Sequence, residues 1–174
     1  MQQLKDKLEQ ALHQAPKFEA MKEQVQITVT GEGLRVELLE TKAGMFFETG
    51  NANPTETGAQ LLSVLAQTMG KLANGIVIEG HTDAKPYSDG GLYTNWELSA
   101  DRANATRRYM EDHGLRENQV HEIRGFADQL LRTPDDPENA SNRRISVIVK
   151  YLNVATTIPA PAKTGGVPAE KPTH

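Results

Sequence analysis

This chain of 174 residues has no cysteine, which excludes disulfides and thiolate metal sites. Its formal net charge of −4 argues against the basic surface that nucleic-acid binding requires. Hydrophobic residues make up 37% and charged residues 24%, which is typical of one globular domain with flanking segments. The residues after Met1 include no apolar signal-peptide core, and no stretch approaches the 18 apolar residues of a membrane span. We therefore expect either a cytosolic protein or a soluble piece of a larger one.

Residues 1–24 predict an amphipathic helix with a narrow apolar stripe. Leu4, Leu8 and Leu12 recur at helical spacing in an otherwise charged segment. Pro16 should break the helix near its end. Because the apolar face is narrow, we expect a linker helix rather than a core helix.

The first strands should form a hairpin. Apolar and polar residues alternate over 25–30 and again over 34–38, and the Gly31-Glu32-Gly33 turn separates them. Thr55 or Thr57 can cap the helix that follows. Its apolar positions are Leu61, Leu62, Leu65 and Met69.

The second half of the chain continues this alternation of strands and helices. The apolar run 76–78 predicts a buried strand, and a helix should extend from about Trp96 to His113. A less clear strand follows near Val120, and the alternation over 145–151 predicts a last strand. The resulting order, β-β-α-β-α-β-β, predicts an α+β fold: a two-layer sandwich in which helices pack on one face of a small mixed sheet.

The helix from Trp96 places an arginine on its apolar side. At 100° per residue, Asn95 and Arg102 fall in the middle of the arc of apolar residues. A guanidinium there is costly unless it is paired or holds an anion. Asp83, after the buried strand, could face Arg102, and the two would suit a zwitterion whose carboxylate binds Arg102 and whose ammonium binds Asp83. The helix N-terminus at Asn95 also favours a carboxylate. The alternative is a structural Arg–Asp pair.

Three neighbouring residues have a functional and a structural interpretation. Arg143 and Arg144 precede the last strand and should point to opposite faces, which brings one of them near the ligand. Alternatively, they are a solvated pair that protects a sheet edge. Thr82 either contacts the ligand or satisfies the backbone at the strand end.

Other chemistries find little support. His81 and Asp83 could form half of a metal site, but His113 and His121 add no recognised ligand spacing, so we expect neither a metal nor a cofactor. There is no Gly-x-Ser-x-Gly motif and no Ser–His–acid order, so we expect no enzymatic activity. Gly31-x-Gly33 lies in a hairpin and is not a dinucleotide-binding fingerprint.

Four motifs in order resemble the OmpA-like peptidoglycan-binding domain over roughly residues 25–152. They are Gly80-His81-Thr82-Asp83, Leu98-Ser99-Ala100-Asp101-Arg102-Ala103, Gly125-Phe126-Ala127 and Asn142-Arg143-Arg144. The insertion between Pro86 and Ser99 makes the chain most similar to the periplasmic C-terminal domains of flagellar stator proteins of the MotB type. The resemblance implies binding of diaminopimelate in the peptidoglycan stem peptide, with helices packed on one sheet face.

The same resemblance assigns roles to individual residues. Asp83 and Arg102 would grip the ammonium and the carboxylate of diaminopimelate, while Thr82, Leu98 and Arg143 match neighbouring contact positions. We add Asn95, at the start of the helix, to this set. The inserted loop 84–94 could reshape or cover the site.

The resemblance also implies a place in the cell. We expect a periplasmic, non-enzymatic anchor that holds a stator to the cell wall, as a homodimer, with a MotA-like stator subunit as partner and an inner-membrane helix outside this chain. Residues 1–24 would be a linker, 25–152 the peptidoglycan-binding domain and 153–174 a disordered tail rich in proline and alanine. The alternatives are an OmpA- or Pal-type envelope anchor, a dimerisation module and, with least support, a wall-modifying hydrolase.

Overall fold

The computed structural model describes residues 1–16, 18–41, 44, 46–87 and 91–152. Its elements are, in chain order, α1 (Gln2–His13), the short turns η1 (Phe18–Ala20) and η2 (Lys22–Gln24), β1 (Val25–Val29), β2 (Gly33–Leu39), α2 (Glu56–Met69), β3 (Ile76–His81), α3 (Asn95–Asp112), β4 (Val120–Gly125), η3 (Ala140–Asn142) and β5 (Arg144–Lys150). The predicted order of strands and helices is confirmed. The predicted disordered tail, 153–174, lies outside the described residues.

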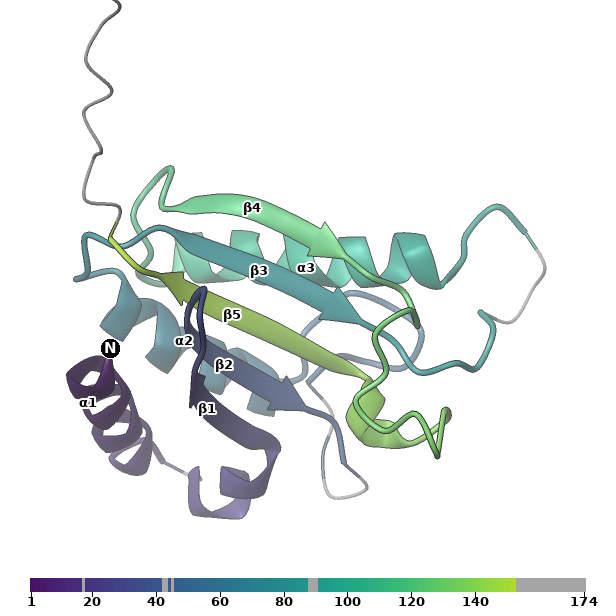
Figure 1. Cartoon of the computed structure of the whole chain (residues 1–174), viewed down its shortest axis with the longest axis horizontal. Coiled ribbons are helices and arrows are strands. Elements are labelled where there is room, and N and C mark those ends of the chain that lie inside the picture. Colours follow the sequence, from purple (N-terminus) through teal and green to yellow (C-terminus); the bar gives the residue numbers. More distant parts are fainter. Residues whose placement is uncertain (17, 42–43, 45, 88–90, 153–174) are drawn as a thin grey trace, which may run out of the picture.

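The five strands form one mixed sheet in the order β1-β2-β5-β3-β4 (Figure 1). Only β3 and β4 run parallel; the other neighbours are antiparallel. The last strand is thus the central one, and the interpretation of Arg143 and Arg144 as protecting a sheet edge is wrong. Because β5 is antiparallel to β2 and β3, its start lies beside their ends, and Arg144 pairs with both Leu39 and His81. We call this end of the sheet the site end.

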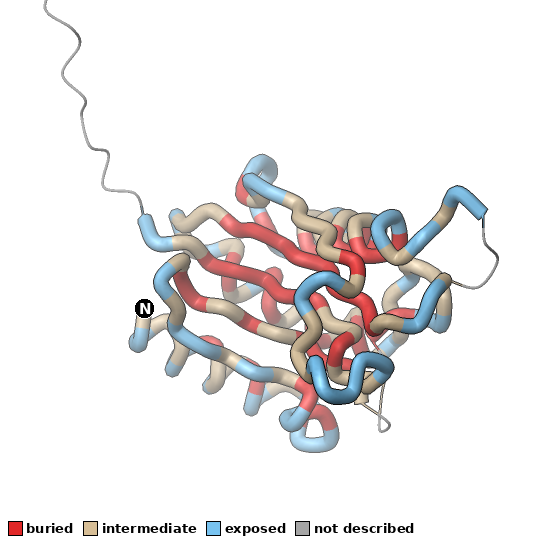
Figure 2. The backbone as a smooth tube through the Cα atoms, turned by 45° about the vertical axis from the view of Figure 1, so that its right-hand side comes forward, coloured by how far each residue is buried: buried red, intermediate tan, exposed pale blue. Residues whose placement is uncertain are grey.

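The helices cover one face of the sheet, as predicted, and the hydrophobic core lies between the two layers (Figure 1). Alternate residues of β2, β3 and β5 face α2 and α3, so the buried stretches follow the central strands (Figure 2). The sheet side of this core comprises Leu34, Val36, Leu38, Ile76, Ile78, Ile145, Val147 and Val149.

Helix α1 belongs to this core. Leu8 and Leu12 are fully buried, and the helix packs against α2 and β1. The expectation that this segment is a linker helix and not a core helix is therefore wrong. The narrow apolar stripe is enough to pack α1 onto the core, because α2 and β1 offer it apolar residues, Val64 and Ile27 among them. The helix ends at His13, before Pro16, as predicted.

Ion pairs line the opposite face of the sheet. Glu79 of β3 is 3% exposed and pairs with Arg35 at 2.7 Å and with Arg124 at 2.8 Å. His81 Nε2 lies 3.4 Å from the same carboxylate. Burial alone would raise the pKa of Glu79, but the hydrogen bonds from His81, Arg35 and Arg124 together outweigh it and lower this pKa to about 2. Within the described ranges, no helix is both long and apolar enough to cross a bilayer.

Candidate ligand-binding site

Four charged side chains from different elements meet at the site end. Glu40 follows β2, Asp83 follows β3, Arg143 precedes β5 and Arg102 comes from α3. Glu40 is 3%, Asp83 7% and Arg102 5% exposed, so three of the four are buried. We call these four residues the charged cluster. Antiparallel pairing of the central strands brings their ends together, which the sequence alone did not specify.

Asp83 is paired with Arg143 and not with Arg102. Its Oδ2 lies 2.5 Å from Nη1 of Arg143, and its Oδ1 accepts a hydrogen bond from the backbone N–H of Lys85 at 3.0 Å. The side-chain amide of Asn95 donates to the carbonyl oxygens of Lys85, at 3.0 Å, and of Asp83, at 3.4 Å. The expected structural Asp–Arg pair exists, but with a different arginine.

Arg102 points inward, as predicted, and the chain between Phe47 and Asn51 holds it. Its Nε donates to the carbonyl oxygen of Asn51 at 2.9 Å and its Nη2 to that of Glu48 at 3.4 Å. The guanidinium carbon lies 5.3 Å from the centre of the Phe47 ring. Burial lowers the pKa of Arg102, partly offset by the charge of Glu40, but an arginine stays protonated. No described residue accepts a hydrogen bond from Nη1, which remains available to an anion.

Arg143 joins the two carboxylates of the cluster. Its Nε donates to Oε2 of Glu40 at 2.7 Å, while Nη1 serves Asp83. Burial lowers the pKa of Arg143, but the two carboxylates outweigh that effect and raise it. Oε1 of Glu40 is buried and has no partner among the described residues. The cluster thus holds two cations, two anions and one unsatisfied acceptor.

Close packing between β3 and α3 sets the position of Arg102. A Cβ on Gly80 would lie 2.0 Å from the carbonyl oxygen of Ser99, so only glycine allows this approach. Ser99 Oγ accepts a hydrogen bond from the N–H of Ala127 at 3.0 Å, and Ala127 O accepts one from the N–H of Thr82.

Two further predicted site residues lie nearby. Leu98, 6% exposed, packs in the same turn of the helix as Ser99. The Thr82 hydroxyl donates to the carbonyl oxygen of Asp83, so it satisfies the backbone at the strand end, which was the structural interpretation of this residue.

The described ends of the inserted loop are tied to the same region. The Tyr87 hydroxyl donates to the carbonyl oxygen of Gly50 at 2.9 Å, next to the segment that holds Arg102. Tyr93 donates to Asp101 at 2.7 Å, and the two tyrosine rings lie 4.9 Å apart at 61°. Trp96, in the first turn of α3, is 53% exposed, and this end of α3 extends beyond the ends of β3 and β4 (Figure 1). Residues 88–90 of this loop lie outside the described residues.

Two cavities adjoin the cluster. The smaller one, of about 10 Å³, has a mixed lining, in which Phe46 and Phe47 lie beside Glu40, Arg102 and Arg143. A groove of about 480 Å³ opens beside Arg143, and it is lined by Glu40, Asp136, Glu138 and Ser141 among others.

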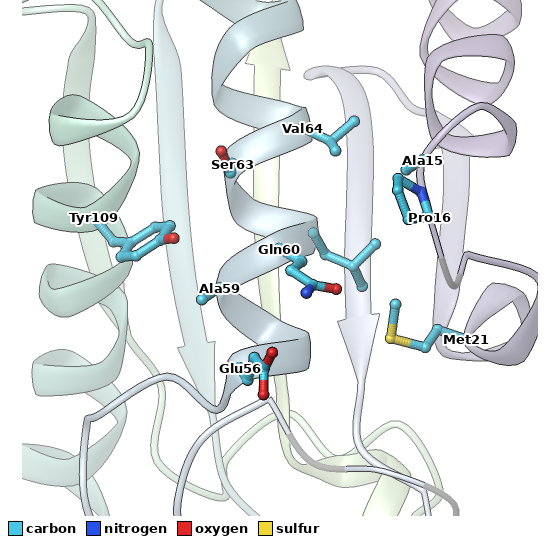
Figure 3. Close-up of a pocket in the computed structure, with 10 residues that line it drawn as sticks. Ala15, Pro16, Met21, Glu56, Ala59, Gln60, Ser63, Val64 and Tyr109 are labelled. Carbon is cyan, nitrogen blue, oxygen red and sulfur yellow. The ribbon is translucent and has the colours of Figure 1, made fainter.

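A groove of similar size, about 470 Å³, lies between α1 and α2 (Figure 3). Val64, Pro16 and Met21 give it an apolar lining, with Tyr109 of α3 at its far side. Among the described residues that line it, Glu56 is the only charged one, so these residues offer no cation to a carboxylate. We therefore place the candidate site at the charged cluster.

Reasoning from the sequence missed Glu40 and the carbonyl groups of Glu48 and Asn51. A signal for Glu40 existed: like Asp83, it is a carboxylate directly after an apolar strand. The carbonyl groups had no signal, since any residue carries one. No group of three histidine, aspartate or glutamate side chains in the described part of the chain is arranged to hold a metal ion.

Two comparisons of the sequence with known proteins agree. The model of the OmpA family matches residues 46–145. Motility protein B of Escherichia coli (strain K12) is 35% identical over 150 residues, which are 86% of this chain and 49% of that protein. This chain thus spans about half the length of that relative.

Two solved structures share the fold. The cell wall anchor of the T6SS from Pseudomonas aeruginosa superposes with a TM-score of 0.65 at 19% identity, over 82% of this chain and 96% of that one. The periplasmic domain of Helicobacter pylori MotB superposes with a TM-score of 0.63 at 18% identity, over 72% of this chain and 87% of that one. At such identities the likeness concerns the fold alone.

Proposed function

The chain belongs to the OmpA family, and we propose that it binds peptidoglycan without cleaving it and so anchors a flagellar stator of the MotB type to the cell wall. The observation that carries this proposal is the charged cluster, in which Arg102 keeps Nη1 unpaired beside Asp83 and Arg143. A site with separated positive and negative groups is complementary to a zwitterion.

The ligand we propose is the diaminopimelate of the stem peptide. Its side chain ends in an ammonium and a carboxylate on the same carbon. Arg102 would bind the carboxylate through Nη1, and Asp83, which has lone pairs beyond those used by Arg143 and Lys85, would accept the ammonium. Thr82, Leu98 and Asn95 would frame the site.

The names of the relatives support the cellular role. One relative is called Motility protein B, one fold neighbour is a cell wall anchor, and another is a periplasmic domain of MotB. We propose a periplasmic location, homodimers, a MotA-like stator subunit as partner and a membrane anchor elsewhere in the full protein. Two copies on one wall would strengthen a weak single contact through effective concentration. Residues 25–152 would form the binding domain, with α1 packed on it.

Co-sedimentation with purified peptidoglycan sacculi tests this proposal. Arg102→Lys keeps the charge but loses the fork geometry, and we expect it to lower the bound fraction at least about tenfold. Arg107→Ala is the matched control, because Arg107 lies on the same helix and its partners among the described residues are Asn104 and Glu111. Wild-type binding by Arg102→Lys, with both variants folded by circular dichroism, would contradict the assignment.

One observation favours a second candidate. The carbonyl groups of Glu48 and Asn51 already use two nitrogens of Arg102, as expected of a purely structural arginine in a dimerisation module. In that case Arg102→Lys lowers the melting temperature but leaves sacculus binding unchanged. The two measurements together separate the candidates.

A further inference from the structure

A third groove, of about 310 Å³, lies next to the charged cluster, since Ala84, which follows Asp83, is one of its lining residues. It is lined by Tyr87, Tyr93, Asn95, Trp96 and Asp128, among others, near the start of α3. Its volume lies at the lower end of the range of about 300–1,000 Å³ for ligand pockets. Asn95 connects the two sites, since it lines this groove and donates to the carbonyl oxygen of Asp83. We call it the aromatic groove.

The two tyrosine rings of this groove are held in place by their hydroxyl groups and by their contact with each other. The hydroxyl groups of Tyr87 and Tyr93 are used by Gly50 and Asp101, which fixes both rings. Burial and the Asp101 carboxylate raise the pKa of Tyr93, so its hydroxyl stays a donor. Trp96 is the only tryptophan of the chain, it is 53% exposed, and its indole N–H donates to no described residue.

Hydrogen-bonding atoms accompany these rings. Oδ1 of Asp128 accepts from its neighbour Gln129, while Oδ2 has no partner in the described part of the chain. The amide nitrogen of Asn95 is engaged, and its oxygen has no described donor. Sugar rings need this combination: the electron-rich face of an indole attracts their C–H groups, and acceptors at the rim bind their hydroxyl groups.

We propose that the aromatic groove binds a pyranose ring of the peptidoglycan glycan strand, with Trp96 stacked on the sugar. This inference rests on the proposed function, because the stem peptide and the glycan are covalently linked and would occupy adjoining sites. Asp128 is the one charged residue among the described residues that line the groove, and its negative charge disfavours a polyanionic partner. A neutral N-acetylated sugar meets no charge conflict there.

The test uses chitotetraose, a neutral chain of four β-1,4-linked N-acetylglucosamine units, as the probe. Because Trp96 is the only tryptophan, its fluorescence reports on the groove directly, and we expect a saturable change with a blue shift. By calorimetry, Trp96→Ala should weaken binding about tenfold and Trp96→Phe less, because Phe retains an aromatic face. Leu130→Ala, which changes a side chain 51% exposed and outside the groove, should bind like wild type.

Unchanged fluorescence at saturating chitotetraose, or equal affinity of Trp96→Ala and wild type, would overturn the inference. A diaminopimelate stem peptide is titrated separately. Wild type that binds the oligosaccharide but not the peptide contradicts diaminopimelate as the ligand of the charged cluster and leaves the glycan site standing. Wild type that binds the peptide but not the oligosaccharide contradicts the glycan site alone.

Discussion

Arg143 lies between two carboxylates, and its Nη1 is 2.5 Å from Oδ2 of Asp83. This ion pair crosses from the start of the central strand to the end of its neighbour, so it connects β5 to the chain that leaves β3. It also leaves Arg102 without a carboxylate of its own among the described residues. A ligand carboxylate would supply the missing charge, which is why the pairing of Arg143 matters for Arg102.

Removing Arg143 should destabilise the fold. Arg143→Ala leaves the buried Glu40 without its counter-ion, and we expect a loss of about 2 kcal/mol in the free energy of unfolding. Arg107→Ala is matched in exposure, 31% against 30% for Arg143, but its partner Glu111 remains solvated, so its cost should stay below about 0.5 kcal/mol. Urea denaturation measures both values, and equal losses would contradict the role of Arg143.

A methyl group at Gly80 should separate α3 from β3. Since its Cβ would lie 2.0 Å from the backbone of Ser99, Gly80→Ala should cost about 3 kcal/mol and reduce ligand binding by displacing Arg102. Gly31→Ala is the control, because nothing lies within 4 Å of its Cβ position. Thermal unfolding of the two variants decides: a Gly80→Ala protein as stable as Gly31→Ala would refute the close approach.

The packing of α1 can be tested in the same way. Leu8 is fully buried, so Leu8→Ala leaves a cavity and should cost about 3 kcal/mol. The exposed Gln10 on the same helix gives the control, and Gln10→Ala should change stability by less than about 0.5 kcal/mol. If both variants unfold at the wild-type midpoint, α1 is not part of the cooperative core.

Acid should weaken the ion-pair network on the open sheet face. The folded pKa of Glu79, about 2, lies below its ordinary value of 4.5, so the unfolded chain binds more protons between these values. The stabilisation is complete above pH 4.5 and is lost as the pH falls through 2; its upper limit is about 3 kcal/mol. Burial also lowers the pKa of His81, which adds to the loss below pH 6.5.

The variant Glu79→Gln isolates the contribution of Glu79. At pH 7 it should be less stable than wild type, and between pH 4.5 and 2 its stability should fall less steeply. Chemical denaturation across this range supplies both slopes. Parallel curves for the two proteins would show that Glu79 does not have a depressed pKa.

Local sequence patterns predicted the helices and strands, while long-range contacts determined the strand order and the packing of α1. Alternation in β2 and β5 depends only on which face is buried, so these strands could be derived from the sequence. The central position of β5 depends on pairing between distant segments, and the solvated-edge interpretation of Arg143 failed for that reason. The packing of Leu8 and Leu12 against α2 likewise depends on the surface of α2, so the pattern within residues 1–24 could not predict it.

In the candidate site, too, local features could be predicted from the sequence and long-range contacts could not. Helical spacing correctly predicted that Arg102 points inward, because the wheel is a local property. Its partners could not be predicted, since they are backbone carbonyls of a distant loop. The exposure of Trp96 depends on where α3 extends past the sheet, which no periodicity records. The sequence thus indicated which residues contribute to the site, but only the folded structure shows which of them pair with one another.

In the proposed complex, Arg102 recognises the carboxylate on the side chain of diaminopimelate. Calorimetric titration with two stem tripeptides, one carrying diaminopimelate and one carrying lysine in its place, tests this contact, since the lysine peptide keeps the ammonium and lacks that carboxylate. We predict that wild type binds the diaminopimelate peptide at least about tenfold more tightly, and that Arg102→Lys loses this preference while Arg107→Ala retains it. Equal affinity of the wild-type chain for the two peptides would show that Arg102 does not recognise this carboxylate.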